Sequence, residues 1–150
     1  MQRSLLARTA ASGSAASVLS IATLAARGRR DDASAWAPLN APSHWLFGRR
    51  ALRQDGASWR YSASGLVTHH LASLFWAWFY ERLLGRRAGL AGRVAGAALV
   101  TGTAALVDLT VVPARLTPGF EHRLSARSLA LVYAAFALGL AAGSIALARR

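Results

Sequence analysis

The sequence predicts an all-α protein, a four-transmembrane-helix bundle with a long polar and interfacial loop between the first two helices. The apolar residues make up 54% of the 150-residue chain. They gather in four blocks, near residues 5–26, 66–84, 90–112 and 127–148. Each block is close in length to the ~20 residues that cross a bilayer as a helix. The blocks are apolar on nearly all faces, and little polar sequence remains to cover them in water. We therefore expect a single integral membrane domain over residues 1–150.

The basic residues are all arginine, and they stand at the ends of the apolar blocks and in the connections. They number 18 against six acidic residues, which gives a formal net charge of +12. A basic chain can bind nucleic acid. This placement instead indicates contact with anionic lipid headgroups. The expected partner is therefore the lipid bilayer and not nucleic acid. The chain has no cysteine, which excludes disulfides and thiolate metal sites.

The first block follows Arg3 and Arg8 and is rich in alanine, serine and glycine. Such a start is also typical of a cleaved signal peptide, so that alternative stays open for residues 1–27. Small residues recur at every fourth position along two stripes: Thr9, Gly13 and Ser17, and Ser12, Ala16 and Ser20. This spacing lets membrane helices approach closely, which favours a first transmembrane helix.

Residues 28–65 form the long polar connection. Its part around Pro38 and Pro42 contains tryptophans, which favour the boundary between headgroups and lipid tails. We expect no regular helix here before Pro42. The run from Ser43 to Leu52 is either a short interfacial helix with Ser43 as its cap or a surface loop.

The second and third blocks form a hairpin. Aromatic residues cluster near the far end of residues 66–84, where they suit the opposite interface. The Gly85–Arg87 segment turns the chain into the third block. Pro113 ends that block because proline has no N–H to donate. The start of the second block and the end of the third therefore lie on the same side of the membrane.

Small residues also predict where the later helices pack. Gly92 and Gly96 are four residues apart in the third block, and Ala135, Gly139 and Gly143 keep the same spacing in the fourth. We expect close helix contacts along both stripes.

The arginines also bear on orientation. With four spans, both termini and the hinge at residues 85–93 share one side, which carries eight arginines against ten on the other. Short connections count more than long loops in setting orientation, and the hinge is dense in arginine. We expect both termini in the cytoplasm and the protein in the inner (cytoplasmic) membrane.

A polar cluster is expected where the hairpin opens. Its members are His69, His70, Asp108, Arg115, Glu121 and His122. A charge inside an apolar span costs roughly 2.5–3.5 kcal/mol, so Asp108 needs a partner. Asp108 and His69 lie at similar depths, so we expect the aspartate to pair with His69 or His70, with Arg115 as the competing partner. Such a pair either fixes helix register or forms a proton-exchanging or ligand-binding pocket.

Other chemistry has weaker support. A metal site for zinc or iron would draw on His44, Glu121 or His122, but no HxxxH or HExxH spacing is present. A bis-histidine haem lacks a second histidine at depth, and we expect no cofactor. The sequence has no GxSxG, Walker or Rossmann pattern, so nothing supports a hydrolase or a dehydrogenase.

Several short motifs of the hairpin point to a family. They are Gly65 with Val67-Thr68-His69, Gly89-Leu90, and Leu116-Thr117-Pro118. With these motifs, residues 65–118 resemble YagU-like bacterial inner-membrane proteins, a family without an established activity. Asp108 stands where that family can carry a histidine, so this chain offers a carboxylate there. The resemblance implies an inner-membrane location and no catalytic activity.

Three functions stay open from the sequence. The expected one is a structural or accessory membrane protein that acts through a homo-oligomer or a membrane protein partner. The second is a small transporter or proton-linked channel subunit, for which four spans would have to oligomerise to frame a pathway. The third is a membrane metal-binding protein that uses the histidines.

Overall fold

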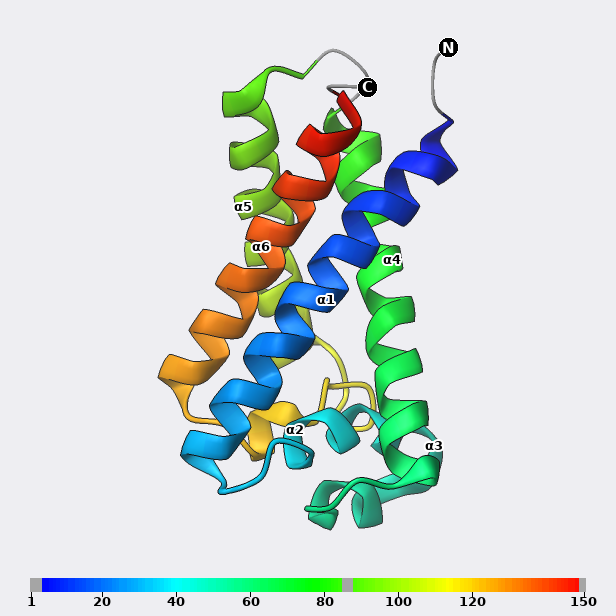
Figure 1. Ribbon diagram of the computed structural model, residues 1–150, viewed down its shortest axis with the longest axis vertical. Coiled ribbons are helices and arrows are strands. Elements are labelled where there is room, and N and C mark those ends of the chain that lie inside the picture. Colours follow the sequence, from blue (N-terminus) through cyan, green and yellow to red (C-terminus); the bar gives the residue numbers. More distant parts are fainter. Residues whose placement is uncertain (1–3, 85–87, 149–150) are drawn as a thin grey trace.

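The computed structural model describes residues 4–84 and 88–148, and every regular element in these ranges is helical. Four long helices lie side by side along the molecule: α1 (Leu5–Asp31), α4 (Ser64–Leu84), α5 (Leu90–Leu106) and α6 (Ala126–Ala148) (Figure 1). The all-α class predicted from the sequence is therefore confirmed. Arg3, the Gly85–Arg87 turn and Arg149-Arg150, which entered the expectations above, lie outside the described residues.

Three helices are long and apolar enough to cross a membrane. They are α1, α5 with the π-helical turn η4 (Val107–Val111) that continues it, and α6. The fourth long helix, α4, is not among them, although four spans were expected. Its two adjacent histidines, together with Glu81 and Arg82 at its end, leave α4 without a membrane-length stretch as apolar as those in the other three. Length and composition therefore identify three helices that could cross a membrane, and α4 is not one of them.

Helix α1 packs against both α6 and α4 (Figure 1). Its buried face consists mainly of small residues: Thr9, Ser12, Gly13, Ala16, Ser17, Ser20, Leu24 and Gly28. On α6, a Cβ atom added to Gly139 would lie 2.3 Å from the Cα atom of Ala16, and one added to Gly143 would lie 2.7 Å from the carbonyl oxygen of Ala11. The backbones of α1 and α6 thus touch along a seam that only small residues allow.

The glycines of α5 differ from each other in their surroundings. Gly96 is buried, and a Cβ atom there would lie 3.0 Å from Leu84 of α4. Gly92 is exposed, and among the described residues a Cβ atom added there would meet only Ala88 within 4 Å. Contact between α4 and α5 near their connecting turn therefore passes through Gly96.

The hydrophobic core has two parts. One part joins all four long helices, through residues such as Ala16, Tyr80, Val100 and Leu140. The other lies near the opposite end and joins Leu24 and Val132 to residues of the connections, Leu39 and Phe120 among them. The connections thus supply part of the core instead of lying loosely on the surface.

The segment between α1 and α4 is more helical and more buried than a polar loop. Helix α1 continues to Asp31, and five short helices follow: α2 (Ala37–Asn40), η1 (Ala41–Ser43), α3 (His44–Phe47), η2 (Gly48–Arg53) and the π-helical η3 (Trp59–Ala63). Residues 37–44 are all buried. The prediction of no regular helix before Pro42 is wrong, because Pro38 sits in the first turn of α2, where its missing N–H has no helical partner to lose.

Asn40 organises this segment. Its side-chain amide donates to the carbonyl oxygens of Gln54 and Gly56, both at 2.9 Å, and its Oδ1 accepts from Ser62 at 2.6 Å. Ser43 does not cap α3 with its side chain as expected. Its hydroxyl instead donates to the carbonyl oxygen of Asn40 at 2.7 Å. Buried hydrogen bonds therefore hold the short helices in place, beneath the start of α4.

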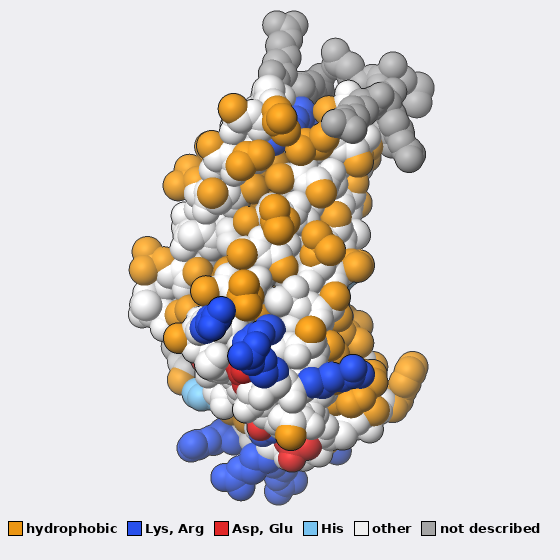
Figure 2. Space-filling view, turned by 60° about the vertical axis from the view of Figure 1, so that its left-hand side comes forward, with side chains coloured by type: hydrophobic (Ala, Val, Ile, Leu, Met, Phe, Trp, Pro, Cys, Tyr) orange, Lys and Arg blue, Asp and Glu red, His pale blue; other side chains and the backbone are white. Residues whose placement is uncertain are grey.

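Apolar and charged side chains divide along the length of the molecule. On the face that Figure 2 shows, hydrophobic side chains run along the long helices, while arginine and acidic side chains gather at the end with the short helices. Leucines of the long helices stand outward, such as Leu99 at 61% and Leu138 at 66% exposure. An apolar flank beside a charged end is the distribution that a bilayer favours.

Candidate functional site

The structure distributes the six residues of the predicted polar cluster over separate contacts. The Asp108 carboxylate accepts a hydrogen bond from the Tyr133 hydroxyl of α6 at 3.2 Å. His69 Nε2 lies 2.8 Å from the hydroxyl oxygen of Ser20 on α1. The expected hydrogen bond between Asp108 and His69 or His70 therefore does not occur within the described residues. Each of the two polar groups finds its partner on a different neighbouring helix.

Phe120 explains why the two helices of the hairpin do not bring these groups together. It belongs to the short helix η5 (Phe120–His122) and is 4% exposed. Its ring centroid lies 6.3 Å from that of His69 and 6.5 Å from that of Tyr133, with the rings edge-on in both cases. The connection after Pro113 thus folds back into the bundle and inserts an aromatic ring between the two polar pairs.

The remaining members of the predicted cluster differ in burial: Arg115 and His122 are exposed, whereas the Glu121 side chain is 17% exposed and its Oε2 is buried. Glu121 and His122 are neighbours with 3.6 Å between Oε1 and Nε2, and the His122 side chain is 56% exposed. Arg115 is exposed, and neither it nor His70 makes a hydrogen bond or ion pair with any of the described residues. The six residues therefore do not form one site.

His44 joins two of the connections through its ring nitrogens. Its ring nitrogens lie 2.9 Å from the carbonyl oxygen of Ala41 and 3.4 Å from that of Ala114. Gly119 beside it has a φ of +86°, and an added Cβ atom there would lie 2.8 Å from His44 Nδ1. Across residues 4–84 and 88–148, no group of three or more His, Asp or Glu side chains is placed to hold a metal ion.

A buried charged site lies at the opposite end of the bundle, where α1 begins and α6 ends. Glu81 of α4 is fully buried, and its Oε2 lies 3.5 Å from Nη1 of Arg8 on α1. Neither carboxylate oxygen accepts a hydrogen bond from the described residues. A buried carboxylate without hydrogen-bond donors is unusual, and in a membrane protein it marks a candidate functional group.

Arg93 of α5 completes this site. It is 7% exposed, and its guanidinium donates to the carbonyl oxygen of Ser144 on α6 at 3.3 Å and to the Ser144 hydroxyl. The Tyr80 hydroxyl of α4 donates to the carbonyl oxygen of Arg93 at 3.1 Å. We call Arg8, Tyr80, Glu81, Arg93 and Ser144 the buried charge cluster. All four long helices contribute to it, each from about one turn inside its end.

From the sequence, Arg8 and Arg93 were expected only at helix ends, and Glu81 was not expected in a site. The four-residue spacing could have indicated the direction of Glu81, because Ser73, Ala77 and Glu81 follow one another on the buried face of α4. Arg93 likewise precedes Ala97 and Thr101 on the buried face of α5. A charge that continues a stripe of small residues points into the helix contact and not toward headgroups.

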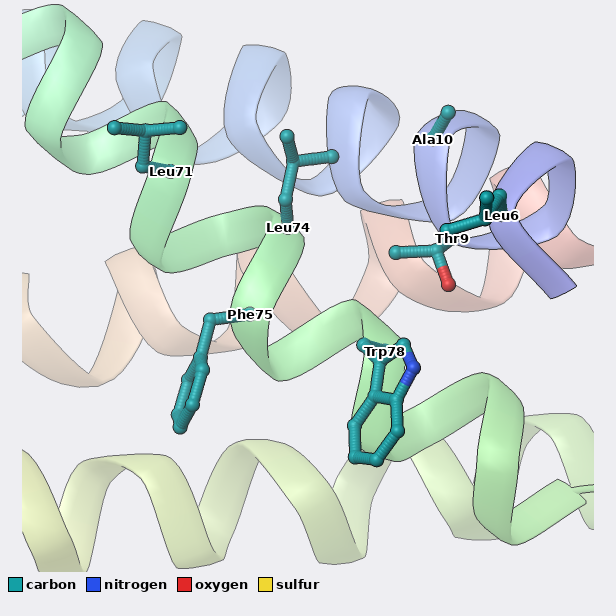
Figure 3. Close-up of a pocket in the computed structure, with 7 residues that line it drawn as sticks. All are labelled: Leu6, Thr9, Ala10, Leu71, Leu74, Phe75 and Trp78. Carbon is teal, nitrogen blue, oxygen red and sulfur yellow. The ribbon is translucent and has the colours of Figure 1, made fainter.

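An apolar groove runs between α1 and α4 beside this end of the bundle. It encloses about 500 Å³ and is open to the outside. Its lining residues come from the two helices, as Figure 3 shows: Leu6, Thr9 and Ala10 of α1, and Leu71, Leu74, Phe75 and Trp78 of α4. Its volume lies within the roughly 300–1,000 Å³ of small-molecule sites, but its walls offer almost no polar group.

Comparison with known proteins adds no relative. No protein-family model, curated protein or solved structure matches the chain. The resemblance of residues 65–118 to YagU-like proteins stays a prediction. The side chains and their contacts are therefore what a functional proposal can rest on.

Proposed function

We propose that the chain is an integral membrane protein in which α1, α4, α5 and α6 all cross the bilayer, and that it is an accessory protein without catalytic activity. The three apolar helices support the membrane location. Helix α4 packs between α1 and α5. Its 21 residues span ~31 Å at ~1.5 Å per residue, close to the ~30 Å of a hydrocarbon core.

Interhelical pairing of the polar side chains carries the proposal of an accessory role. Four such pairs each join two long helices or their extensions: Ser20–His69, Asp108–Tyr133, Arg8–Glu81 and Arg93–Ser144. Polar groups used in this way fix the helices against each other and do not line a pathway. The groove between α1 and α4 is apolar, which suits a lipid or a partner helix better than a hydrophilic solute.

A flux assay tests this proposal. Purified protein is reconstituted into liposomes that contain a pH-sensitive dye. A pH difference between the inside and the outside of the liposomes is then imposed. We expect the dye signal to decay at the same rate as in liposomes without protein, because the paired helices leave no polar route. A decay that is several-fold faster would contradict the accessory role.

The second candidate is a proton-linked transporter subunit, and Glu81 is the observation that favours it. A fully buried carboxylate that accepts no hydrogen bond from the described residues is the kind of group that serves as a proton relay in membrane transporters. If the liposomes leak protons, Glu81→Gln distinguishes the cause. Loss of the proton flux in Glu81→Gln would establish that the protein transports protons through Glu81. A proton flux that persists in Glu81→Gln would indicate a non-specific leak.

The contacts of the arginines bear on orientation. Among the described arginines at the end with the buried charge cluster, Arg8 and Arg93 pair inside the bundle and Arg82 is exposed. Arg27 and Arg123 pair with aspartates at the other end, where eight more are exposed. Because positively charged ends favour the cytoplasm, we propose that the end with the short helices is cytoplasmic, the reverse of the orientation expected from the hinge. The inner membrane stays the proposed location.

A further inference from the structure

We propose that the groove between α1 and α4 binds one acyl chain of an anionic phospholipid, with the lipid phosphate beside Arg82. The inference rests on the membrane residence proposed above, but not on the accessory role. The proposed occupant is a lipid of the leaflet next to the buried charge cluster.

The lining of the groove calls for an apolar occupant. Leu71 and Phe75 of α4 are 59% and 55% exposed, and Leu6 of α1 is 75% exposed. Trp78 stands near the end of the groove at 39% exposure. Side chains of this size gain most when a flexible apolar chain fills the space between them. Tryptophan at such a level is typical of the boundary between lipid tails and headgroups.

The depth of the groove fits one leaflet. From Leu71 to Arg82 the helix rises through eleven residues, or ~16 Å at ~1.5 Å per residue. Half of a ~30 Å hydrocarbon core is ~15 Å. A transmembrane helix, whether from a partner or from a second copy, would need a contact surface across both leaflets. At the wall of the groove, Gly13 of α1 lies against Leu74 and Ala77 of α4, so the two helices touch there.

The positive charge of Arg82 at the open end of the groove selects an anionic headgroup. Arg82 lies one turn beyond Trp78 on the same side of α4 and is exposed. It makes no ion pair with any residue that the structure describes, because the neighbouring Glu81 points into the bundle and pairs with Arg8. An exposed guanidinium at this level is well suited to a phosphate, and it attracts anionic lipid with about 1 kcal/mol, or roughly fivefold in affinity.

Native mass spectrometry of the purified full chain tests the site. The protein is incubated with phosphatidylglycerol and phosphatidylcholine that carry identical acyl chains, and lipid retained on the protein is counted. We expect about one retained phosphatidylglycerol, preferred roughly fivefold over phosphatidylcholine. Arg82→Gln should remove this preference. Arg127→Gln, an exposed arginine at the start of α6 and the other end of the bundle, should keep it.

A second pair of variants tests the groove itself. Ala10→Phe places a ring into the groove and should abolish retention of both lipids, while Ala142→Phe, at an exposed alanine of α6, should leave it unchanged. Equal retention of the two lipids by the wild type would overturn the proposal, and so would a preference that survives Arg82→Gln. A lipid-free dimer that Ala10→Phe dissociates would assign the groove to a second copy instead. Lipid retention and proton flux are separate measurements, so failure of the lipid site is distinguishable from failure of the accessory role.

Discussion

Gly139→Leu should cause the largest loss of stability of any single substitution in the last helix. The added Cβ atom alone would lie 2.3 Å from the Cα atom of Ala16 and 2.6 Å from its nitrogen, and backbone atoms cannot move aside as a side chain can. Helices α1 and α6 would have to separate along their seam. We expect a cost at or above the upper end of the ~1–3 kcal/mol typical of overpacking. The measurement is the thermal midpoint of the purified protein in detergent.

Gly102→Leu is the matched control for this substitution. Gly102 lies in α5, and an added Cβ atom there meets nothing within 4 Å. Leucine is also the better helix former, so the control should hold or raise the midpoint. Similar midpoints for Gly139→Leu and Gly102→Leu would show that α1 and α6 do not pack backbone to backbone.

The second large effect is expected in the buried charge cluster. Arg8→Met leaves the fully buried Glu81 carboxylate without its cation, and an uncompensated buried charge costs about 3–5 kcal/mol. The double variant Arg8→Met with Glu81→Met should recover most of that loss, since apolar residues of similar size can replace a buried ion pair at little cost. The thermal midpoint in detergent again measures the change.

Arg82→Met provides the comparison, because Arg82 is exposed and lies next to Glu81 in the chain. It should change the midpoint little. If Arg8→Met proves as mild as Arg82→Met, or if the double variant is no more stable than Arg8→Met, the ion pair is not what holds this end of the bundle together.

Much of the fold could be predicted from apolar block length and four-residue spacing, because both are local properties. The all-helical class and the three helices that are apolar enough to cross a membrane follow from them. The connection at residues 28–65 could not be predicted in the same way. Its short helices depend on Asn40, whose amide reaches residues 14 and 16 positions away, and such a tertiary contact leaves no periodic pattern.

The site was harder to predict, because the depth of a residue along a helix does not determine which way its side chain points around the helix axis. Asp108 and His69 have similar depths, but they face different neighbours, Tyr133 and Ser20. The ring of Phe120 between them comes from a connection whose path the sequence does not reveal. For Glu81 the direction could have been predicted, because it continues the stripe of small residues on the buried face of α4. Its position near the end of the helix instead suggested contact with headgroups.

Whether α4 crosses the membrane is the central question, because α4 alone among the long helices is not apolar enough by composition. The chain has no cysteine, so single cysteines can be introduced on either side of α4. Gly56 and Gly89 are exposed, and a Cβ atom added at either meets none of the described residues within 4 Å. Gly56→Cys and Gly89→Cys are therefore labelled with a membrane-impermeant maleimide in intact and in permeabilised cells. If α4 spans the bilayer in the proposed orientation, Gly89→Cys reacts in intact cells and Gly56→Cys reacts only after permeabilisation. The exchanged pattern would reverse the orientation and keep the span, whereas labelling of both cysteines from the same side would contradict the four-helix membrane bundle.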